Sequence, residues 1–325
     1  MQSNEIMVSI NCITYNHGKF IEQTLNSFLN QKTNFKFEIL IHDDASTDNT
    51  QEIIKKYAEI YPDIIKPILQ KENQYSKGVK RIGYLFNESR AKGKYIAWCE
   101  GDDYWNDHLK LQKQVDIMEK NEDISMCFHA AIVKDDYSKK ELTQRAYSKS
   151  CFAEVKDIIL NGGGFCPTAS LIYPRKILKK FPEFYLEAHV GDYPLQMILA
   201  SLGKVYYIDE PMCVYRTNVK GSWTNRMLNN IDIIEKIIGN VKKDIDLLNE
   251  FDKFTNGIYK EHIYNKIKKC NFEIYSISGD LKKLKSEEYN EMFKNLPLKK
   301  KYKIYIINKS PKLYRLLNKI KNKYQ

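Results

Sequence analysis

The sequence predicts an α/β fold, a Rossmann-like and mostly parallel sheet flanked by helices, followed by a helical C-terminal region. Over about the first hundred residues, short runs rich in β-branched residues alternate with segments of helical periodicity, as in parallel βαβ units. Polar or acidic residues directly follow consecutive predicted strands. From residue 226 onward the pattern is long and helical. We therefore expect two parts, an α/β domain over 1–225 and a helical, basic region over 226–325.

Composition favours a globular protein without a membrane span. The chain has 325 residues, 43% of them hydrophobic, with 23 Tyr and 14 Phe, which is more apolar than disordered chains are. Its seven cysteines are scattered without a CxxC pair, which is typical of a reduced, cytosolic chain without structural zinc. We see no signal-peptide pattern and no long apolar run, and expect a cytoplasmic protein that could work at the inner face of the cell membrane.

The individual elements follow from periodicity and from turn residues. Predicted strands cover residues 7–14, 37–42, 64–69, 95–98, 124–133, 168–173 and 205–208. Predicted helices cover residues 20–29, 50–60, 82–91, 109–120, 152–160, 177–181 and 194–202. The polar stretches 70–81 and 135–150 are expected to be loops.

The stretch KYIAWCEGDDYW (94–105) carries the strongest chemical signal. A buried strand runs into a turn with Glu100, Asp102 and Asp103. In open α/β sheets, ligands bind at the C-terminal edge of the strands. Neighbouring carboxylates repel one another there and usually need a cation, and hard oxygen ligands suit Mg²⁺ or Mn²⁺. The plainer alternative is a solvated acidic turn, because Gly-Asp is an ordinary turn dipeptide.

Two further predicted strands deliver polar residues to the same edge. Thr14, Tyr15 and Asn16 follow the first strand, and Asp43 and Asp44 follow the second. The sequence contains neither a GxGxxG nor a GxxxxGK[ST] motif, so the usual dinucleotide and P-loop phosphate sites are missing. Polar groups at three consecutive strand ends indicate a ligand site.

These stretches resemble the family 2 glycosyltransferases, inverting enzymes of the GT-A fold. The matching segments cover roughly residues 7–224 and stop near Met227. They are ITYNHGKFIEQTLNSFLNQ, EILIHDDASTDNT, AKGKYIAWCEGDDYW, KLQKQVDIM, PTASLIY, GDYPL and VYR…GSW. The first and third are specific in combination, whereas each alone is weak.

The resemblance implies a nucleotide-sugar donor, commonly a UDP-sugar, with Mn²⁺ or Mg²⁺ as cofactor. By position, Thr14, Tyr15 and Asn16 would line the nucleotide pocket, and Asp43 and Asp44 would hold the base and ribose.

The resemblance also assigns the acidic turn and its surroundings. Asp103 would be the direct metal ligand, and Asp102 would contact the ribose or the metal through water. Glu100 stands where the family often has the first Asp. Asp192, in Gly-Asp-Tyr, matches the general base, although on sequence alone it is more typical of a helix N-cap.

The remaining implied contacts lie on the diphosphate side. Arg216 and Trp223 match a closing loop, and Lys80 or Arg81 could add a cationic contact. Related chains often carry a histidine two residues after that arginine. Here the residue is Asn218, so an imidazole metal ligand is absent at that position.

The expected function is that of an inverting, metal-dependent hexosyltransferase. It would move a sugar to a hydroxyl of a surface glycan, such as a capsule or O-antigen, with a glycan or lipid-linked glycan as acceptor. One alternative is a GT-A-like nucleotidyltransferase, which the missing Gly-rich first loop argues against. Another is a non-catalytic basic module that binds membrane or nucleic acid, which the acids in the strand-end turns argue against.

The C-terminal segment Lys294–Gln325 holds the basic charge. It has ten Lys, one Arg and no acidic residue, which equals the net charge of +11 for the whole chain. A basic amphipathic helix is typical of contact with an anionic membrane, and the alternative is a helix packed on the main domain. No nucleic-acid motif accompanies the charge, so we expect no nucleic-acid partner.

Overall fold

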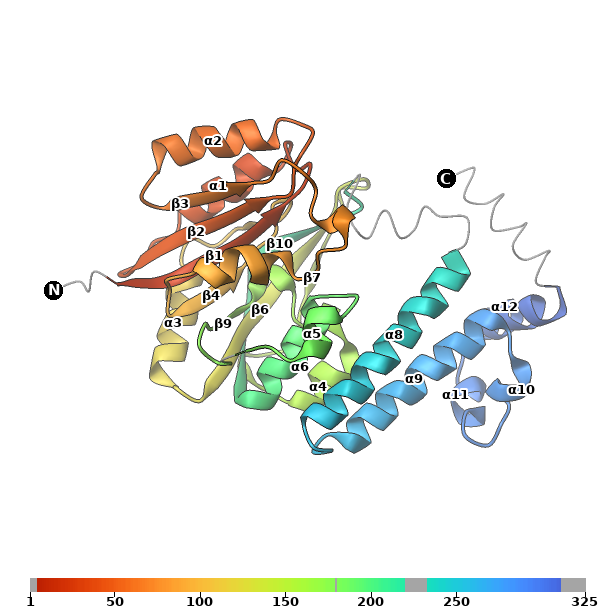
Figure 1. Cartoon of the computed structure of the whole chain (residues 1–325). Coiled ribbons are helices and arrows are strands. Elements are labelled where there is room, and N and C mark those ends of the chain that lie inside the picture. Colours follow the sequence, from red (N-terminus) through yellow and green to blue (C-terminus); the bar gives the residue numbers. More distant parts are fainter. Residues whose placement is uncertain (1–4, 179, 220–232, 311–325) are drawn as a thin grey trace. The chain divides into compact units, whose positions relative to one another are not determined.

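The computed structural model describes residues 5–178, 180–219 and 233–310. The chain divides into two compact units, Met1–Met227 and Leu228–Gln325. Figure 1 shows a sheet with flanking helices in the first and helices in the second. The expected α/β class with a helical C-terminal region is thus confirmed.

The sheet of the first unit is mixed. Its strand order is β3-β2-β1-β4-β9-β6-β10-β5, with β7 on β6 and β8 on β10. The pairings among β3, β2, β1 and β4 are parallel, as is the pairing of β6 with β10. The strands are β1 (Ile6–Thr14), β2 (Lys36–Asp43), β3 (Ile65–Leu69), β4 (Tyr95–Trp98), β5 (Tyr104–Trp105), β6 (Ile124–Asp135), β7 (Glu141–Gln144), β8 (Cys151–Ala153), β9 (Ile172–Pro174) and β10 (Lys204–Thr217). Short antiparallel strands therefore complete a largely parallel framework.

Helices of the first unit connect these strands. They are α1 (Ile21–Leu29), α2 (Thr50–Ile60), α3 (Lys110–Lys120), α4 (Val155–Asn161), α5 (Glu183–Glu187) and α6 (Asp192–Leu202). Single turns of 3-10 helix occur at η1 (Tyr75–Lys77), η3 (Glu88–Arg90), η4 (Gly163–Phe165) and η5 (Thr168–Ser170), and η2 (Gly83–Asn87) is a π-helical turn.

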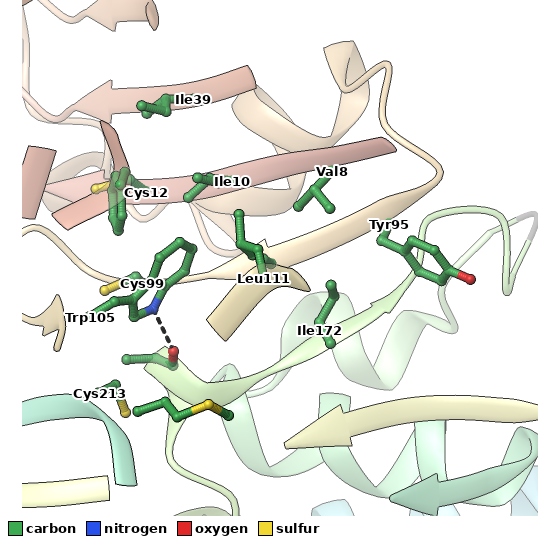
Figure 2. Packing of buried hydrophobic residues seen from close by; sticks show 14 of the residues in the cluster. Val8, Ile10, Cys12, Ile39, Tyr95, Cys99, Trp105, Leu111, Ile172 and Cys213 are labelled. Carbon is green, nitrogen blue, oxygen red and sulfur yellow. Dashed lines mark hydrogen bonds between the residues drawn. The ribbon is translucent and has the colours of Figure 1, made fainter. Parts of the chain in front are cut away.

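The core lies along the central strands. Val8, Ile10 and Cys12 on β1 are fully buried, and Figure 2 shows their side chains along that strand. Ser9 and Asn11, which point to the other face, are also buried, so both faces of β1 are covered, as expected for the middle of a parallel sheet. Trp105 is also buried, and its Nε1 donates to the Ala169 carbonyl oxygen at 2.9 Å. This packing fixes the edge at which β1, β2 and β4 end.

Two predicted helices of the first unit differ from the structure. The segment predicted at 82–91 is helical, but it is wound as the π-helical turn η2 and the 3-10 turn η3 and not as an α-helix. Asn87 and Glu88, adjacent in sequence, both hydrogen-bond Asn11 on β1, and the altered winding lets both reach it. Residues 177, 178, 180 and 181 are not helical, and α5 begins at Glu183. Pro182 explains this, because proline disfavours the helical conformation in the residue before it and suits a helix start.

Other boundaries moved by a few residues. The predicted loop 135–150 contains the strand β7. The predicted helix 152–160 divides into β8 and α4, because Glu154 between them has an extended backbone. The predicted strand 168–173 begins as the 3-10 turn η5 and only then becomes β9. The strand predicted at 205–208 continues through an irregularity at 208–213 to Thr217.

The second unit is helical throughout its described part. Its helices are α8 (Ile233–Phe254), α9 (Lys260–Ser278), α10 (Leu281–Leu284), α11 (Asn290–Lys294) and α12 (Leu298–Lys309). Leu284, Phe293 and Ile304 form a small buried cluster that joins α10, α11 and α12. Within the ranges that the structure describes, no helix of either unit combines the length and apolarity needed to span a membrane.

Candidate active site

The acidic turn after β4 gathers three carboxylates. One oxygen each from Glu100, Asp102 and Asp103 lies within 4.8 Å of the others. The turn is held close to β1, because Gly101 N donates to the Ile13 carbonyl oxygen at 2.9 Å. A Cβ atom on Gly101 would lie only 2.5 Å from Thr14 Oγ1. Glycine is therefore required for the acids to approach the end of β1.

Asp103 is the most enclosed of the three acids. Its side chain is 1% exposed, and its Oδ1 accepts a hydrogen bond from the backbone N–H of Arg216 at 2.8 Å. The Thr24 hydroxyl on α1 donates to the Asp103 carbonyl oxygen at 2.6 Å. Segments from α1 and β10 thus fix this turn from two sides.

Arg216 lies against the same turn. Its guanidinium donates to the carbonyl oxygen of Asp102 and to Gln23 Oε1. It also lies over the rings of Phe20 and Tyr104, at 4.9 and 4.6 Å from their centroids. Only 7% of Arg216 is exposed. The cation is therefore positioned beside the acids by contacts within the chain.

Burial and like charges raise the pKa values of two acids of the triad. Burial, with the negative charges of Asp102 and Asp192, raises the pKa of Glu100 to about 8. Burial and the charges of Asp102 and Glu100 raise the pKa of Asp103 well above its usual range, against the opposing effect of Arg216. These shifts mean that the chain alone does not offset the charge of the triad.

The donor set of the triad fits a hard divalent cation. Mg²⁺ and Mn²⁺ prefer carboxylate oxygens, and here three carboxylates converge. A bound cation would offset the repulsion that raises the pKa values of Glu100 and Asp103. Asn218 stays apart, because its side-chain amide donates to Asp135 Oδ2 at 2.7 Å.

Asp192 begins α6 and lies near the triad, since its charge contributes to the raised pKa of Glu100. A Cβ atom on Gly163 would lie 2.7 Å from Asp192 Oδ2, so the glycine turn η4 lies directly against the carboxylate. Gln196, one turn later on α6, donates to the carbonyl oxygens of Gly163 and Cys166, both at 2.9 Å. The carboxylate is thereby held between a helix start and a tethered loop.

Arg81 lies against the residue before Asp192, since a Cβ atom on Gly191 would lie 2.6 Å from Arg81 Nη1. Its guanidinium donates to the Ala188 carbonyl oxygen and lies 5.3 Å from the centroid of the Tyr185 ring. Burial lowers the pKa of Arg81, and the charge of Asp192 opposes this. Neighbouring Lys80 pairs with Glu187 at 2.9 Å. The loop before η2 is thus fastened to the segment that leads into α6.

The ends of β1 and β2 form a hydrogen-bonded edge. Both oxygens of Asp44 accept backbone N–H groups, from Gln74 at 2.8 Å and Tyr75 at 3.0 Å. The Asn16 backbone, with a left-handed φ of +57°, donates its N–H to Ser46 Oγ at 2.8 Å. The side chain of Tyr15 is half-buried beside it.

Asp43 is fully buried at this edge. Its Oδ1 accepts from Ser46 N at 2.9 Å and from Gln51 Nε2 at 2.6 Å, and its Oδ2 accepts the Ser46 hydroxyl. Thr14 is 3% exposed, and its hydroxyl lies 3.1 Å from His17 Nδ1. Carboxylate oxygens can accept further bonds, so these contacts leave acceptor capacity at the edge.

The structure brings the predicted residues of the acidic turn together with Thr14, Asp192 and Arg216, whereas Trp223 lies outside the described residues. Sequence reasoning passed over three residues that hold the site, namely Gln23, Thr24 and Gln196. Thr24 and Gln196 are fully buried. The available signal was a polar side chain within an apolar helical stripe, which often satisfies nearby backbone groups.

The chain is similar in sequence to known proteins over most of the first unit. The model of glycosyl transferase family 2 matches residues 9–181, more than half of the chain. An uncharacterized protein of Mycobacterium tuberculosis, Rv1520, is 34% identical over 222 residues, which are 66% of this chain. The match spans only 60% of that relative's length.

Solved structures show the same fold at low identity. TarS 1–349 of S. aureus, solved with UDP-GlcNAc, superposes with a TM-score of 0.56 at 18% identity, covering 94% of this chain and 92% of that one. The mannosyltransferase PcManGT of Pyrobaculum calidifontis, solved with GDP-Man and Mn²⁺, gives a TM-score of 0.56 at 15% identity, covering 95% and 89%. Together with the family match, these findings lead to one assignment: the chain belongs to glycosyltransferase family 2.

Proposed function

We propose that the chain is an inverting, metal-dependent glycosyltransferase. It would move a hexose from a nucleotide-sugar, most simply a UDP-sugar, to a hydroxyl of a surface glycan that is free or lipid-linked. The observation that carries the proposal is the acidic triad with Asp192 and Arg216 at one sheet edge. The two solved neighbours bind UDP-GlcNAc and GDP-Man, which supports a nucleotide-sugar donor.

The donor would lie along the ends of β1 and β2. Thr14, Tyr15 and Asn16 would line the nucleotide pocket, and Asp43 and Asp44 would accept bonds from the base and ribose. Their existing bonds to Ser46, Gln51 and the 74–75 backbone hold both carboxylates in fixed orientations. A preorganised acceptor loses little freedom when the donor binds.

The diphosphate would lie over the acidic turn. Asp103 and Asp102 would hold Mn²⁺ or Mg²⁺, with Glu100 beside them. When bound, such an ion supplies Lewis-acid stabilisation of the leaving diphosphate. Arg216 would add positive charge on the same side, and we assign Arg81 and Trp223 supporting contacts with the donor.

The proposed reaction is a single displacement. The acceptor oxygen bonds to the anomeric carbon as the bond to the diphosphate oxygen breaks, and the nucleoside diphosphate leaves. Asp192 takes the proton of the acceptor hydroxyl, a role that typically contributes about 10²–10⁴-fold. One base on the face opposite the leaving group gives inversion. The position of Asp192 near Glu100 supports this assignment.

A binding test examines the proposed donor and metal site independently of the general base. The melting temperature would be measured with UDP, GDP or CDP, each with Mn²⁺ and with EDTA, because a ligand of the folded state raises stability. We expect UDP with Mn²⁺ to raise it and EDTA to abolish the rise. Asp103→Asn should lose the rise, whereas Asp116→Asn, an exposed acid on α3, should keep it.

A turnover test addresses Asp192. Release of UDP from a panel of UDP-sugars would be measured with Asp192→Asn. We expect retained UDP binding and a fall in turnover of at least about 100-fold. If no nucleotide stabilises the wild type, the transferase proposal fails. A rise only with GDP or CDP would refute the UDP-sugar assignment, and full turnover in Asp192→Asn would refute its role as base.

A further inference from the structure

The first turns of α12 expose an apolar pair. Leu298 is 82% exposed and Tyr302 is 70% exposed. Residues four apart on a helix lie on the same face, so the two side chains are neighbours. Lys299, Lys300 and Lys303, on the same two turns of the helix, are also exposed. These five residues are called the α12 patch below.

The opposite side of α12 is anchored in the second unit. Ile304 is 4% exposed and Ile307 is 6% exposed. Ile304 packs in the buried cluster with Leu284 and Phe293. Because these residues fix the helix on one side, the exposure of Leu298 and Tyr302 is not a consequence of a loose terminus. The helix therefore has a packed apolar face and a separate exposed apolar pair.

The charge around the patch has one sign. From Lys294 to Ser310 the sequence has six lysines and no acidic residue. Within the described part of the chain, neither Lys299 nor Lys300 has a carboxylate partner. Their charge is therefore available to an anionic surface, and the exposed pair is available to an apolar one.

We propose that the α12 patch docks the protein on an anionic lipid bilayer. Leu298 and the Tyr302 ring would enter the boundary between headgroups and acyl chains, where leucine and amphipathic aromatic side chains are favoured. The lysines would lie at the level of the phosphates, and each raises binding to an anionic surface about fivefold. A nucleic acid would use the lysines but not a leucine beside them. This inference goes beyond the proposed transfer reaction and does not depend on it.

The test is sedimentation of the full chain with vesicles. Vesicles of phosphatidylcholine with about one quarter phosphatidylglycerol would be compared with pure phosphatidylcholine. We expect wild type to bind the anionic vesicles and to lose binding in high salt. Leu298→Ser with Tyr302→Ser, and separately Lys299→Gln with Lys300→Gln, should each weaken that binding at least about tenfold.

Matched controls lie elsewhere on the second unit. Lys242→Gln with Lys243→Gln removes two exposed lysines from α8, and Ile258→Ser removes an apolar side chain that is 74% exposed. Both should bind like wild type. UDP release should be unchanged in every variant, which separates this test from that of the proposed function.

Three outcomes would overturn the proposal. Wild type could fail to bind anionic vesicles, or the control variants could weaken binding as much as the patch variants. Binding could also depend on Lys299 and Lys300 but not on Leu298 and Tyr302. That last result would indicate a surface for polyanions, and competition by duplex DNA would then identify nucleic acid as its partner.

Discussion

Glu88 provides a test of the fold that is independent of catalysis. Its Oε1 accepts hydrogen bonds from the Tyr173 hydroxyl at 2.8 Å and from Asn11 Nδ2 at 3.1 Å. Burial raises its pKa from 4.5 to about 7, against the opposing effect of those bonds. Glutamine has nearly the same shape as the protonated acid, and its amide oxygen can accept the same two bonds. We therefore predict that Glu88→Gln stabilises the protein at pH 8.

The magnitude follows from the shift in pKa. The folded state binds the Glu88 proton more tightly than the unfolded state, so its contribution to stability is full below about pH 4.5. That contribution is lost as the pH rises through about 7. Each pKa unit corresponds to about 1.36 kcal/mol. A shift from 4.5 to about 7 then gives about 3 kcal/mol, and partial exposure of the residue reduces this to about 2 kcal/mol.

Urea unfolding at pH 5, 6, 7 and 8 would measure this difference. Trp98 and Trp105 lie on β4 and β5 of the first unit, so their fluorescence follows the unit that contains Glu88. Glu88→Gln should match wild type near pH 5 and exceed it by about 2 kcal/mol at pH 8. Glu59→Gln, on the exposed face of α2, is the control. A difference that does not change with pH, or a less stable Glu88→Gln at pH 8, would refute the reasoning.

Two further substitutions test buried polar side chains. Burial lowers the pKa of Lys110 to about 8, so wild type should gain stability as the pH rises from about 8 to 10.5. Lys110→Met should lack this gain and be more stable at pH 7 by about 1–3 kcal/mol, measured by urea unfolding. Gln196→Leu leaves the carbonyl oxygens of Gly163 and Cys166 without its bonds. It should cost about 1–3 kcal/mol and slow UDP release about tenfold, with the UDP-dependent rise in melting temperature retained. An unchanged rate would show that the glycine turn does not position Asp192.

The sequence was sufficient to predict that the polar residues after the first strands lie together, because neighbouring parallel strands end at the same edge of the sheet. Glu100, Asp102 and Asp103 follow a buried run directly, so their place at the edge required only the strand and its direction. Gly101 was visible as a turn residue. Its close approach to Thr14 was not, because that depends on how two strands lie side by side.

Residues that act through tertiary contacts escaped sequence reasoning. The winding of 83–90 depends on Asn11, more than 70 positions earlier, to which Asn87 and Glu88 bond. Local periodicity contains no information about such a partner. In the sequence, Gln196 lies within an apolar helical segment. Only the structure shows the carbonyl oxygens to which its side-chain amide donates hydrogen bonds.

Acids with a raised pKa in the first unit are of two kinds, and the difference between them identifies the candidate site. Burial raises the pKa of Glu88, the hydrogen bonds from Tyr173 and Asn11 oppose this, and no acid is among the causes of the shift. Its shift therefore reflects the burial of a single carboxyl group. For Glu100 and Asp103, neighbouring carboxylates add to the effect of burial. A perturbed pKa alone does not mark function, because structural clusters also produce one. Mutual repulsion is what a bound cation relieves, so the triad, and not Glu88, is the place where a ligand would stabilise the fold.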